Sequence, residues 1–470
     1  MSTSAFIVPI DPKNPSNPAN VVPNVDIAQI WSTVPHGEKV PDVGTTRIFY
    51  DTPATKVTAV SSLGEKFASE KDDMKRELVR RSVGSAVKAL KAFDGLKEVV
   101  IDASADPHAT AVAANLALYK FTLKTKPPSA FNPNLKEPIP PKLQLKPVES
   151  SKEWDRGVTY AYAQNLARTI FCERVKAEFS GVKNVEIIVR DEGIYNTFLS
   201  VTHGTSEPAK FLEIHYKGAP KDAQPLAFVG KGITFDSGGI SLKPGAGMKL
   251  MRGDMGGAGA VVSATLAIAK LKLPVNLITV TPLTENMPGP SATKPGDIIY
   301  AMNGKSVEVD NYGCRRTFNA IYYASTEYKP HTLVDVATLT GAIEIALGDV
   351  YNGVFSTSDD LWQKLHAAGE HEFDRFWRMP LSEDYGPQIY SSNADLCNTG
   401  GRPGGSCTAA LFLKAFAHGI EPEGNAEPAM QWAHVDIAAM EYTRATPYQE
   451  VGLTGRPVRA LIEYVRGLGK

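Results

Sequence analysis

The sequence lacks most of the features that mark secreted, membrane-spanning or nucleic-acid-binding proteins. Its 470 residues include only four cysteines, none in a CxxC spacing, which argues against a disulfide framework and a structural zinc site. No unbroken apolar stretch is long enough to cross a bilayer. The formal net charge is −1 and no basic stripe is present, so binding to a nucleic-acid backbone is not expected. These absences leave an ordinary soluble globular protein.

Several familiar catalytic and targeting signals are also missing. The nine histidines form no HExxH pattern, and we interpret them as structural or solvent-facing. Ser237 stands in FDSGG rather than in a GxSxG elbow, which makes a serine hydrolase the weaker hydrolytic interpretation. The N-terminal residues show neither a basic leader with an apolar core nor an Arg-rich presequence, so a cytoplasmic location is expected.

The alternation of apolar and polar residues predicts two α/β domains. In residues 1–150, strand patterns alternate with helical ones, and a proline-rich passage at 127–147 predicts a stiff connection with a boundary near Ser150. Residues 151–470 continue the alternation, so we expect a small N-terminal α/β domain and a larger catalytic one whose mixed sheet is flanked by helices. The predicted strands are 46–51, 56–60, 98–103, 211–216, 275–280, 332–337 and 433–438, and the predicted helices are 71–93, 109–119, 154–178 and 456–468.

Charged residues gather among glycines in residues 230–257, GKGITFDSGGISLKPGAGMKLMRGDMGG. The apolar run before this stretch predicts a buried strand at 225–229, and 258–271 predicts a packed helix. The charged residues are therefore expected in loops at the sheet edge where open α/β sheets bind ligands. Lys231 and Lys243 bracket Asp236, and Asp254 follows. Carboxylates brought this close need compensating cations, either the lysines or a divalent metal.

The glycines of this stretch favour a binding loop over an ordinary one. A solvated surface loop is the usual explanation of a single Lys or Asp. Gly238, Gly239, Gly256 and Gly257, however, permit positive φ and close approach of the backbone to a ligand. A phosphate site is the weakest interpretation, because the GxxxxGK[ST] order is absent and Asp236 would repel phosphate.

The stretch resembles the signature of the leucyl aminopeptidase family, the two-metal cytosolic aminopeptidases. Further similar blocks follow in the family's order through the C-terminal part of the chain. They are ENMPGPSATKPGD (285–297), VATLTGA (336–342), FWRMPL (376–381), the Ala394-Asp395 pair, GGSCTAALFL (404–413), WAHVDIA (432–438) and GLTGRPVR (452–459). Several long motifs in register are far more specific than one glycine pattern.

The resemblance implies a role for each charged residue. Lys231, Asp236 and Asp254 would be metal ligands, with Asp236 bridging two ions, and Lys243 would help to polarise the scissile carbonyl. A lysine ligates a metal only as the neutral amine, which burial and neighbouring cations favour. Two divalent ions, zinc or manganese in the family, would activate a water and neutralise the oxyanion.

Substrate preference and assembly are implied as well. Met251, Thr338, Leu339 and Gly341 match family positions that line the pocket for the first side chain or bond to the substrate backbone, which implies bulky apolar amino-terminal residues. Leu339 equally fits plain core packing. A homohexamer and a bound bicarbonate acting as general base are further implications of the resemblance.

The chain departs from the family after Val309. There the family has a segment close to VDNTDAEGRL, whose Asp and Glu are ligands and whose Arg holds the bicarbonate. Here Gly313 stands in place of the Asp and Arg315 in place of the Glu, and the stretch is about three residues short. A guanidinium cannot ligate a metal and would repel one. We therefore expect the second metal to bind poorly or not at all.

Two explanations of residues 312–319 follow. One is a frame or splice error in the gene model, since residues 313–320, with suitable synonymous codons and read one base later, encode Asp-Ala-Glu-Gly-Arg-Leu-Met. Short loops after Arg168, where the family has a PAN and TP loop, and after Glu192 agree with this. The other is a catalytically impaired pseudoenzyme or a structural subunit of the same fold. The transcript across codons 309–321 separates them.

Overall fold

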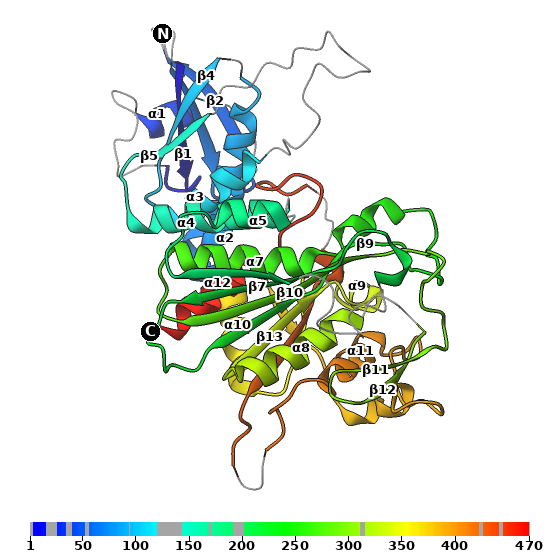
Figure 1. Cartoon of the computed structure of the whole chain (residues 1–470). Helices are drawn as coiled ribbons and strands as arrows, with labels where there is room; N and C mark the ends of the chain where they lie inside the picture. The colour runs from blue at the N-terminus through cyan, green and yellow to red at the C-terminus, as the bar shows by residue number, and fades with distance from the viewer. Residues whose placement is uncertain are drawn as a thin grey trace. The chain divides into compact units, whose positions relative to one another are not determined.

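The computed structural model describes residues 3–15, 26–33, 40–51, 56–93, 95–119, 143–168, 172–190, 202–310, 315–422, 426–440 and 445–469. The chain divides into two compact units. They are Met1–Asn165 with Arg444–Val451, and Leu166–Thr443 with Gly452–Lys470. Each unit combines a sheet with helices, so the predicted α/β fold class is confirmed (Figure 1).

The first unit is built on a five-stranded sheet in the order β2-β3-β1-β4-β5. Neighbouring strands are parallel except β2 and β3. Buried Val8, Ile10, Ile27, Trp31 and Val60 form part of its core. The elements are β1 (Thr3–Ile10), α1 (Ile27–Ser32), β2 (Thr46–Asp51), β3 (Lys56–Ser62), α2 (Asp72–Leu90), β4 (Leu96–Ile101), α3 (Pro107–Ala117), β5 (Gln144–Pro147) and most of α4 (Lys152–Ala167).

The second unit contains a nine-stranded mixed sheet in the order β15-β14-β17-β13-β8-β10-β7-β6, with β9 also paired to β10. Its central strands β17, β13, β8 and β10 run parallel, while β14, β7 and β6 each lie antiparallel to a neighbour. The strands are β6 (Val185–Arg190), β7 (Lys210–Lys217), β8 (Leu226–Gly230), β9 (Gly232–Asp236), β10 (Asn276–Asn286), β13 (Thr332–Ala337), β14 (Asn352–Ser356), β15 (Phe376–Arg378) and β17 (Gln431–Asp436). Strands β8 and β13 are buried along their whole length, as expected for parallel strands covered on both faces.

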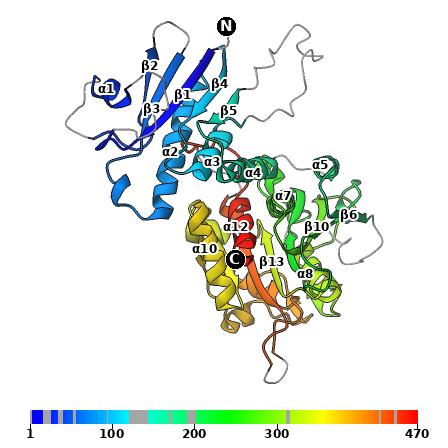
Figure 2. The ribbon, with the colours of Figure 1, turned by 90° about the vertical axis from the view of Figure 1, so that its left-hand side faces the viewer.

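Helices cover both faces of this sheet (Figures 1 and 2). On one face α7 (Gly256–Lys270) packs against β8 and against α12 (Val458–Leu468), which in turn packs on α10 (Asp359–Glu372). On the other, α8 (Arg315–Tyr328) packs against β8 and β10, and its Phe318 meets Phe412 of α11 (Gly405–Lys414) edge to face. A separate three-stranded sheet joins β11 (Ile298–Tyr300), β12 (Ser306–Glu308) and β16 (Leu396–Cys397).

Three local expectations differ from the structure. The single helix predicted at 154–178 is two helices in the described residues, α4 and α5 (Cys172–Glu178). The loop expected after Lys231 contains a short strand, β9, because residues 232–236 pair with β10 across a register shift. The proline-rich passage ends in β5, which lies at the sheet edge, where proline costs no ladder hydrogen bond. Residues 127–142 of that passage lie outside the described residues.

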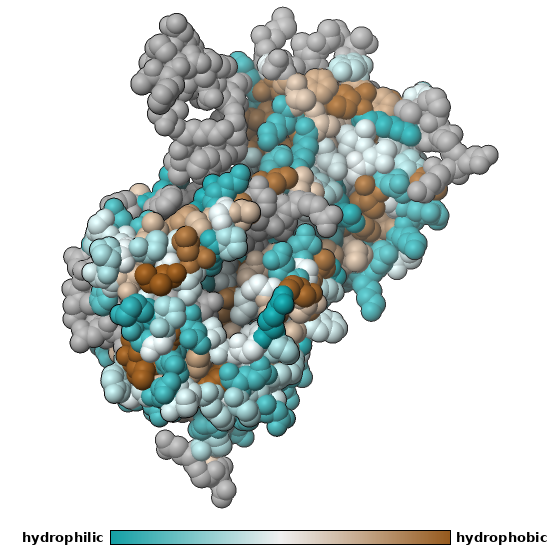
Figure 3. Space-filling model, turned by 90° about the vertical axis from the view of Figure 1, so that its right-hand side faces the viewer, coloured by the Kyte–Doolittle hydropathy of each residue, from teal (hydrophilic) through white to brown (hydrophobic). Residues whose placement is uncertain are grey.

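Within the described ranges, no helix is both long enough and apolar enough to cross a bilayer. On the face shown in Figure 3, hydrophobic residues form small separate groups among hydrophilic ones.

Candidate active site

The charged residues singled out in the sequence lie at the C-terminal edge of the parallel strands. Lys231 directly follows β8, and Asp236 ends β9. Asp254 follows the 3-10 helix η3 (Met248–Gly253), just before α7 begins, and Thr338 follows β13. The backbone N–H of Lys231 donates to the carbonyl of Val336 at 3.0 Å, which ties the ends of β8 and β13 together. This is the sheet edge where ligands bind in open α/β folds.

Glycines bring the start of α7 against these strands. A Cβ on Gly257 would lie 2.1 Å from the carbonyl oxygen of Val336, and one on Gly230 would lie 2.7 Å from the Cα of Ala258. Larger residues would therefore push the helix away from Lys231 and Asp254. Gly238 and Gly239 have φ of 90° and 64°, so they supply the positive φ that the sequence suggested.

Lys231 and Asp254 form a buried pair at the centre of the site. The Lys231 side chain is 3% exposed, and its Nζ donates to Asp254 Oδ1 at 2.7 Å and to the Thr338 carbonyl at 2.6 Å. The Thr338 hydroxyl donates to the same Asp254 Oδ1 at 2.6 Å. Asp254 Oδ2 is buried and has no hydrogen-bond partner among the described residues. One strong acceptor therefore remains unused in the middle of the cluster.

Asp236 forms the second half of the site. Its Oδ2 accepts a hydrogen bond from Lys243 Nζ at 2.5 Å, and its Oδ1 accepts from Asn286 Nδ2 at 2.6 Å and from the Gly238 N–H at 3.0 Å. Asp236 itself is buried, whereas the Lys243 side chain is 34% exposed. Lys243 therefore contacts the buried Asp236 while part of its side chain reaches solvent.

The two carboxylates titrate in opposite directions. Burial raises the pKa of Asp254 to about 6, and the nearby charge of Asp236 adds to the rise despite the attraction of Lys231. Burial also disfavours the charged form of Asp236, but Lys231 and Lys243 hold the pKa of Asp236 below its ordinary value. Paired carboxylates with diverging pKa values, buried at a sheet edge, are typical of functional sites.

The expected substrate residues are distributed around this cluster. Met251 lies in η3, and its Sδ is 3.5 Å from Lys243 Nζ. Leu339 is partly buried and packs against the large hydrophobic cluster, so core packing and pocket lining both describe it. Gly341 is exposed at the start of α9 (Gly341–Leu347). Thr338 is buried and holds the charged residues directly.

The divergent segment starts next to the site. Residues 311–314 lie outside the described residues, and only the backbone of Arg315 is described, as the first residue of α8. Asp310, immediately before the gap, accepts a hydrogen bond on its carbonyl from Ser241 Oγ at 3.5 Å. Its carboxylate accepts from the free Cys397 and from Thr399, at 3.3 and 3.2 Å. The loop that follows Asp236 thus meets the segment where the family carries its remaining ligands. The short stretches after Arg168 and Glu192 also fall on residues outside the description.

Sequence reasoning missed Asn286, which is buried and donates to Asp236. It lies in the ENMPGPSATKPGD block, but an asparagine at the end of a strand carries no signal of its own. The contact depends on the pairing of β9 with β10, which places Asn286 beside Asp236 in the register.

A second group of potential metal ligands lies beside arginine side chains. His371, Glu372 and Glu463 bring ligand atoms within 4.8 Å of one another. Arg466 Nε donates to Glu463 at 2.7 Å, and Arg459 Nη1 lies 3.6 Å from Glu372. Because guanidinium groups already neutralise these carboxylates, we interpret the group as an ion-pair network on α10 and α12.

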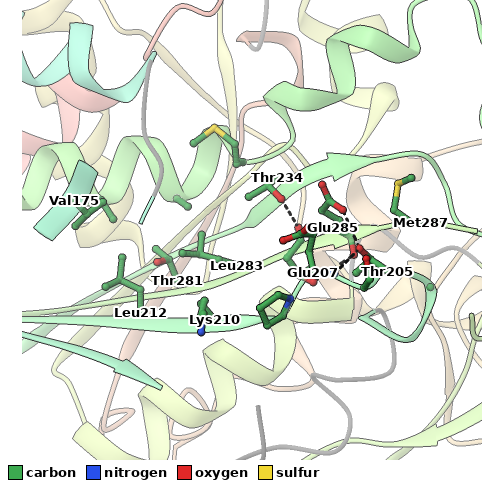
Figure 4. A pocket seen from close by; sticks show the side chains of 17 residues that line it. Val175, Thr205, Glu207, Lys210, Leu212, Thr234, Thr281, Leu283, Glu285 and Met287 are labelled. Carbon is green, nitrogen blue, oxygen red and sulfur yellow. Dashed lines mark hydrogen bonds between the residues drawn. The ribbon is translucent and has the colours of Figure 1, made fainter. Parts of the chain in front are cut away.

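A cavity of about 630 Å³ lies beside β10 (Figure 4). Its lining includes Thr281, Leu283 and Glu285 of that strand, together with Thr205 and Glu207. Thr205 Oγ1 donates to Glu285 at 2.9 Å. None of the predicted metal ligands lines this cavity.

The donor set of the central cluster suits a divalent metal ion. An amine and two carboxylates lie together out of water, and the unused Asp254 Oδ2 is an acceptor that a cation would satisfy. Thr338 donates a hydrogen bond to Asp254, and Asn286 donates one to Asp236. Such hydrogen bonds from residues that are not ligands commonly orient the ligands of metal sites.

Comparison with known proteins identifies the family of the chain. The model of the cytosol aminopeptidase family, catalytic domain, matches residues 155–462. The cytosol aminopeptidase of Dictyostelium discoideum is 42% identical over 453 residues, covering 90% of this chain and 85% of the relative. That of Homo sapiens is 40% identical over 456 residues, with 90% and 83% covered.

Solved structures have the same fold. The bottromycin maturation enzyme BotP in complex with Mn superposes with a TM-score of 0.80 at 26% identity, covering 99% of both chains. The cytosol aminopeptidase from Coxiella burnetii gives a TM-score of 0.78 at 23% identity, with 100% of this chain and 98% of that chain covered. With the family match and the relatives above, the chain belongs to the cytosol aminopeptidase family and, as a member, is a peptidase that acts with divalent metal ions.

Proposed function

We propose that this protein releases bulky apolar residues from the amino termini of peptides, at a metal centre held by Lys231, Asp236 and Asp254. The observation that carries the proposal is the buried convergence of these three side chains, with Asp254 Oδ2 unused among the described residues. When bound, divalent ions supply Lewis-acid polarisation of the peptide carbonyl and a nucleophile from water.

The chain's own residues divide the remaining tasks. Thr338 orients Lys231 through its carbonyl and Asp254 through its hydroxyl. Asn286 orients Asp236. Lys243, which is partly exposed beside Met251, is placed to donate a hydrogen bond to the substrate carbonyl as negative charge develops on its oxygen. In this proposal the carboxylate of Asp236 holds the Lys243 ammonium in place until substrate arrives.

Substrate preference follows from the apolar groups near Lys243. Met251 adjoins its amine, and Leu339 lies on the loop directly after Thr338. Both suit a leucine-like side chain, in keeping with the family resemblance. We propose manganese or zinc as the metals, and the solved complex of BotP with Mn supports the former. A bicarbonate base, a homohexameric assembly and a cytoplasmic location complete the proposal.

A second candidate is a catalytically impaired member of the family that keeps the fold for assembly or binding. The observation that favours it is the sequence at 312–319, which has Gly313 and Arg315 where the family has carboxylate ligands. The chain as written then holds at most one divalent ion, bound weakly, and two-metal catalysis is lost. The loss of one metal and of the base anchor corresponds to roughly three or more orders of magnitude in rate.

The test replaces residues 312–319 with TDAEGRLML, which returns two carboxylates and one arginine. Leucine release from Leu-amide or a leucyl peptide is then expected with manganese or zinc and is abolished by a chelator. Asp236→Asn in the restored protein should remove it again, because a charged side chain that would hold the metal is lost. A restored chain that folds and binds two metals but releases no amino-terminal residue from any peptide tried would overturn the aminopeptidase proposal.

A further inference from the structure

Asp436 is a buried carboxylate to which the sequence assigned no role. It is the last residue of β17, and its register partner on the neighbouring parallel strand is Ala337, the last residue of β13. It is fully buried. Because its partner Ala337 is the last residue of β13, Asp436 lies beside the loop that leaves this strand. The loop passes through Thr338, Leu339 and Thr340 into α9.

Both oxygens of Asp436 are used to hold that loop. Oδ1 accepts from the backbone N–H of Leu339 at 3.1 Å, of Thr340 at 3.4 Å and of Ala438 at 3.2 Å. Oδ2 accepts from the Thr340 hydroxyl at 2.7 Å. A charged carboxylate makes stronger bonds to such donors than a neutral group would. One side chain thus fixes two consecutive residues of the loop.

Thr340 passes this restraint to the following helix. Its side chain caps α9 by accepting a hydrogen bond from the Ile343 N–H at 3.3 Å, while it donates to Asp436. The loop is therefore clamped at its helical end. Its other end is the backbone of β13, which pairs with β17 and β8.

The residue between these clamps is Thr338, which touches both central charges. Its carbonyl accepts from Lys231, and its hydroxyl donates to Asp254. Rotation of the peptide unit joining Thr338 to Leu339 would move the carbonyl of Thr338 and the N–H of Leu339 together, because both belong to that planar unit. The bond from Leu339 to Asp436 thus fixes the direction in which the Thr338 carbonyl points.

We propose that Asp436 is a positioning residue of the aminopeptidase site, which orients the Thr338 carbonyl toward Lys231 and holds Leu339 at the substrate side of the loop. It touches neither substrate nor metal and acts through the 338–340 backbone. The proposed consequence for metal binding rests on the metal centre described under the proposed function, whereas the orientation of Thr338 does not.

The test compares Asp436→Ala and Asp436→Asn with Glu213→Ala. Glu213 is an equally buried carboxylate of the same unit, on β7, and accepts hydrogen bonds from Arg190 and Tyr323 instead. Hydrogen exchange of peptides covering 338–343 and amine labelling of Lys231 are measured on the full chain, well below each variant's melting temperature. These readouts report the loop and the lysine directly. If they responded only to a general loss of stability, Glu213→Ala would change them as much as the Asp436 variants do.

Asp436→Ala is expected to speed exchange at 338–343 about tenfold or more and to increase labelling of Lys231, which is buried in the native protein. Asp436→Asn, which keeps one carbonyl acceptor, should fall between the native protein and Asp436→Ala. Glu213→Ala should leave both readouts near native. If Asp436→Ala does not fold, Thr340→Val removes the hydroxyl donor and should shift both readouts in the same direction by less. Native-like exchange and labelling in the folded Asp436 variants, or equal changes in Glu213→Ala, would overturn the proposal.

Titration with Mn²⁺ measures the consequence of losing Asp436 for metal binding. Loss of Asp436 should weaken Mn²⁺ binding about 10- to 100-fold, the range found when groups that orient metal ligands are removed. If the native chain binds no Mn²⁺, the proposed metal centre fails, and the exchange and labelling results still decide the role of Asp436. If the native chain binds Mn²⁺ and Asp436→Ala binds it equally well, the positioning role is wrong.

Discussion

Acid stability should depend on Glu213, a buried carboxylate that makes no hydrogen bond to the site residues. It lies on β7 and accepts hydrogen bonds from Arg190 Nε at 2.6 Å, from the Tyr323 hydroxyl at 3.2 Å and from the Tyr328 hydroxyl. His215 Nε2 lies 3.3 Å from it. Burial alone would raise the pKa of Glu213, but hydrogen bonds from His215, Tyr328 and Arg190 lower it from 4.5 to about 2.

The direction in which pH changes the stability follows from the linkage between folding and proton binding. A carboxylate whose pKa is lower in the folded state contributes stability above its unfolded pKa, and loses it as the pH falls toward the folded value. The contribution of Glu213 is therefore complete above about pH 5 and declines between about pH 4.5 and pH 2. The full shift corresponds to roughly 3 kcal/mol of unfolding free energy, of which roughly 2 kcal/mol is already lost at about pH 3.

The assay is urea unfolding of the native protein and Glu213→Gln from about pH 7 to pH 3. The native protein should exceed Glu213→Gln in unfolding free energy by a constant amount at the upper end of this pH range. At the lower end this difference should be smaller by roughly 2 kcal/mol. Glu344→Gln, at an exposed position of α9, is the control and should follow the native curve. A difference between native and Glu213→Gln that stays constant down to about pH 3 would refute the reasoning.

Two further predictions concern packing. Truncation after Gly455 removes α12, whose Val458, Leu461, Ile462 and Val465 are buried, and should cost roughly 6–12 kcal/mol, enough to prevent cooperative folding of the second unit. A truncated chain that melts like the full chain would contradict this. Gly257→Ala places a Cβ 2.1 Å from the Val336 carbonyl and should lower the unfolding free energy by about 1–3 kcal/mol, measured by urea unfolding. An unchanged midpoint would show that α7 shifts freely on β13.

Much of the fold follows from local patterns in the sequence. Strand β13 coincides with the predicted 332–337, because Leu333, Val334 and Val336 give a strand signal despite Asp335 among them. Strand β1 was not predicted, although it lies in the middle of its sheet, because its apolar run is short and carries Pro9 near its end. The helix expected at 154–178 has no local break signal where α4 and α5 separate.

Part of the site is similarly visible in the sequence. Lys231, Asp236, Lys243 and Asp254 fall within one glycine-rich stretch, and the structure brings them together. Their partners come from distant segments. Asn286 reaches Asp236 through strand pairing, and Asp436 reaches Leu339 from about a hundred residues away. A single sequence contains no signal for such contacts, because they depend on the order and register of the strands.

The number of metal ions bound tests the central claim most directly. The chain as written, titrated with Mn²⁺ after chelator treatment and analysed for metal content, should hold at most one ion per chain, weakly. Asp236→Asn and Asp254→Asn should hold none, because each removes a charged ligand from the only three that lie among the described residues of the proposed centre. Two tightly bound ions per chain would contradict the effect assigned to residues 312–319, and one ion that both variants retain would contradict the proposed metal centre.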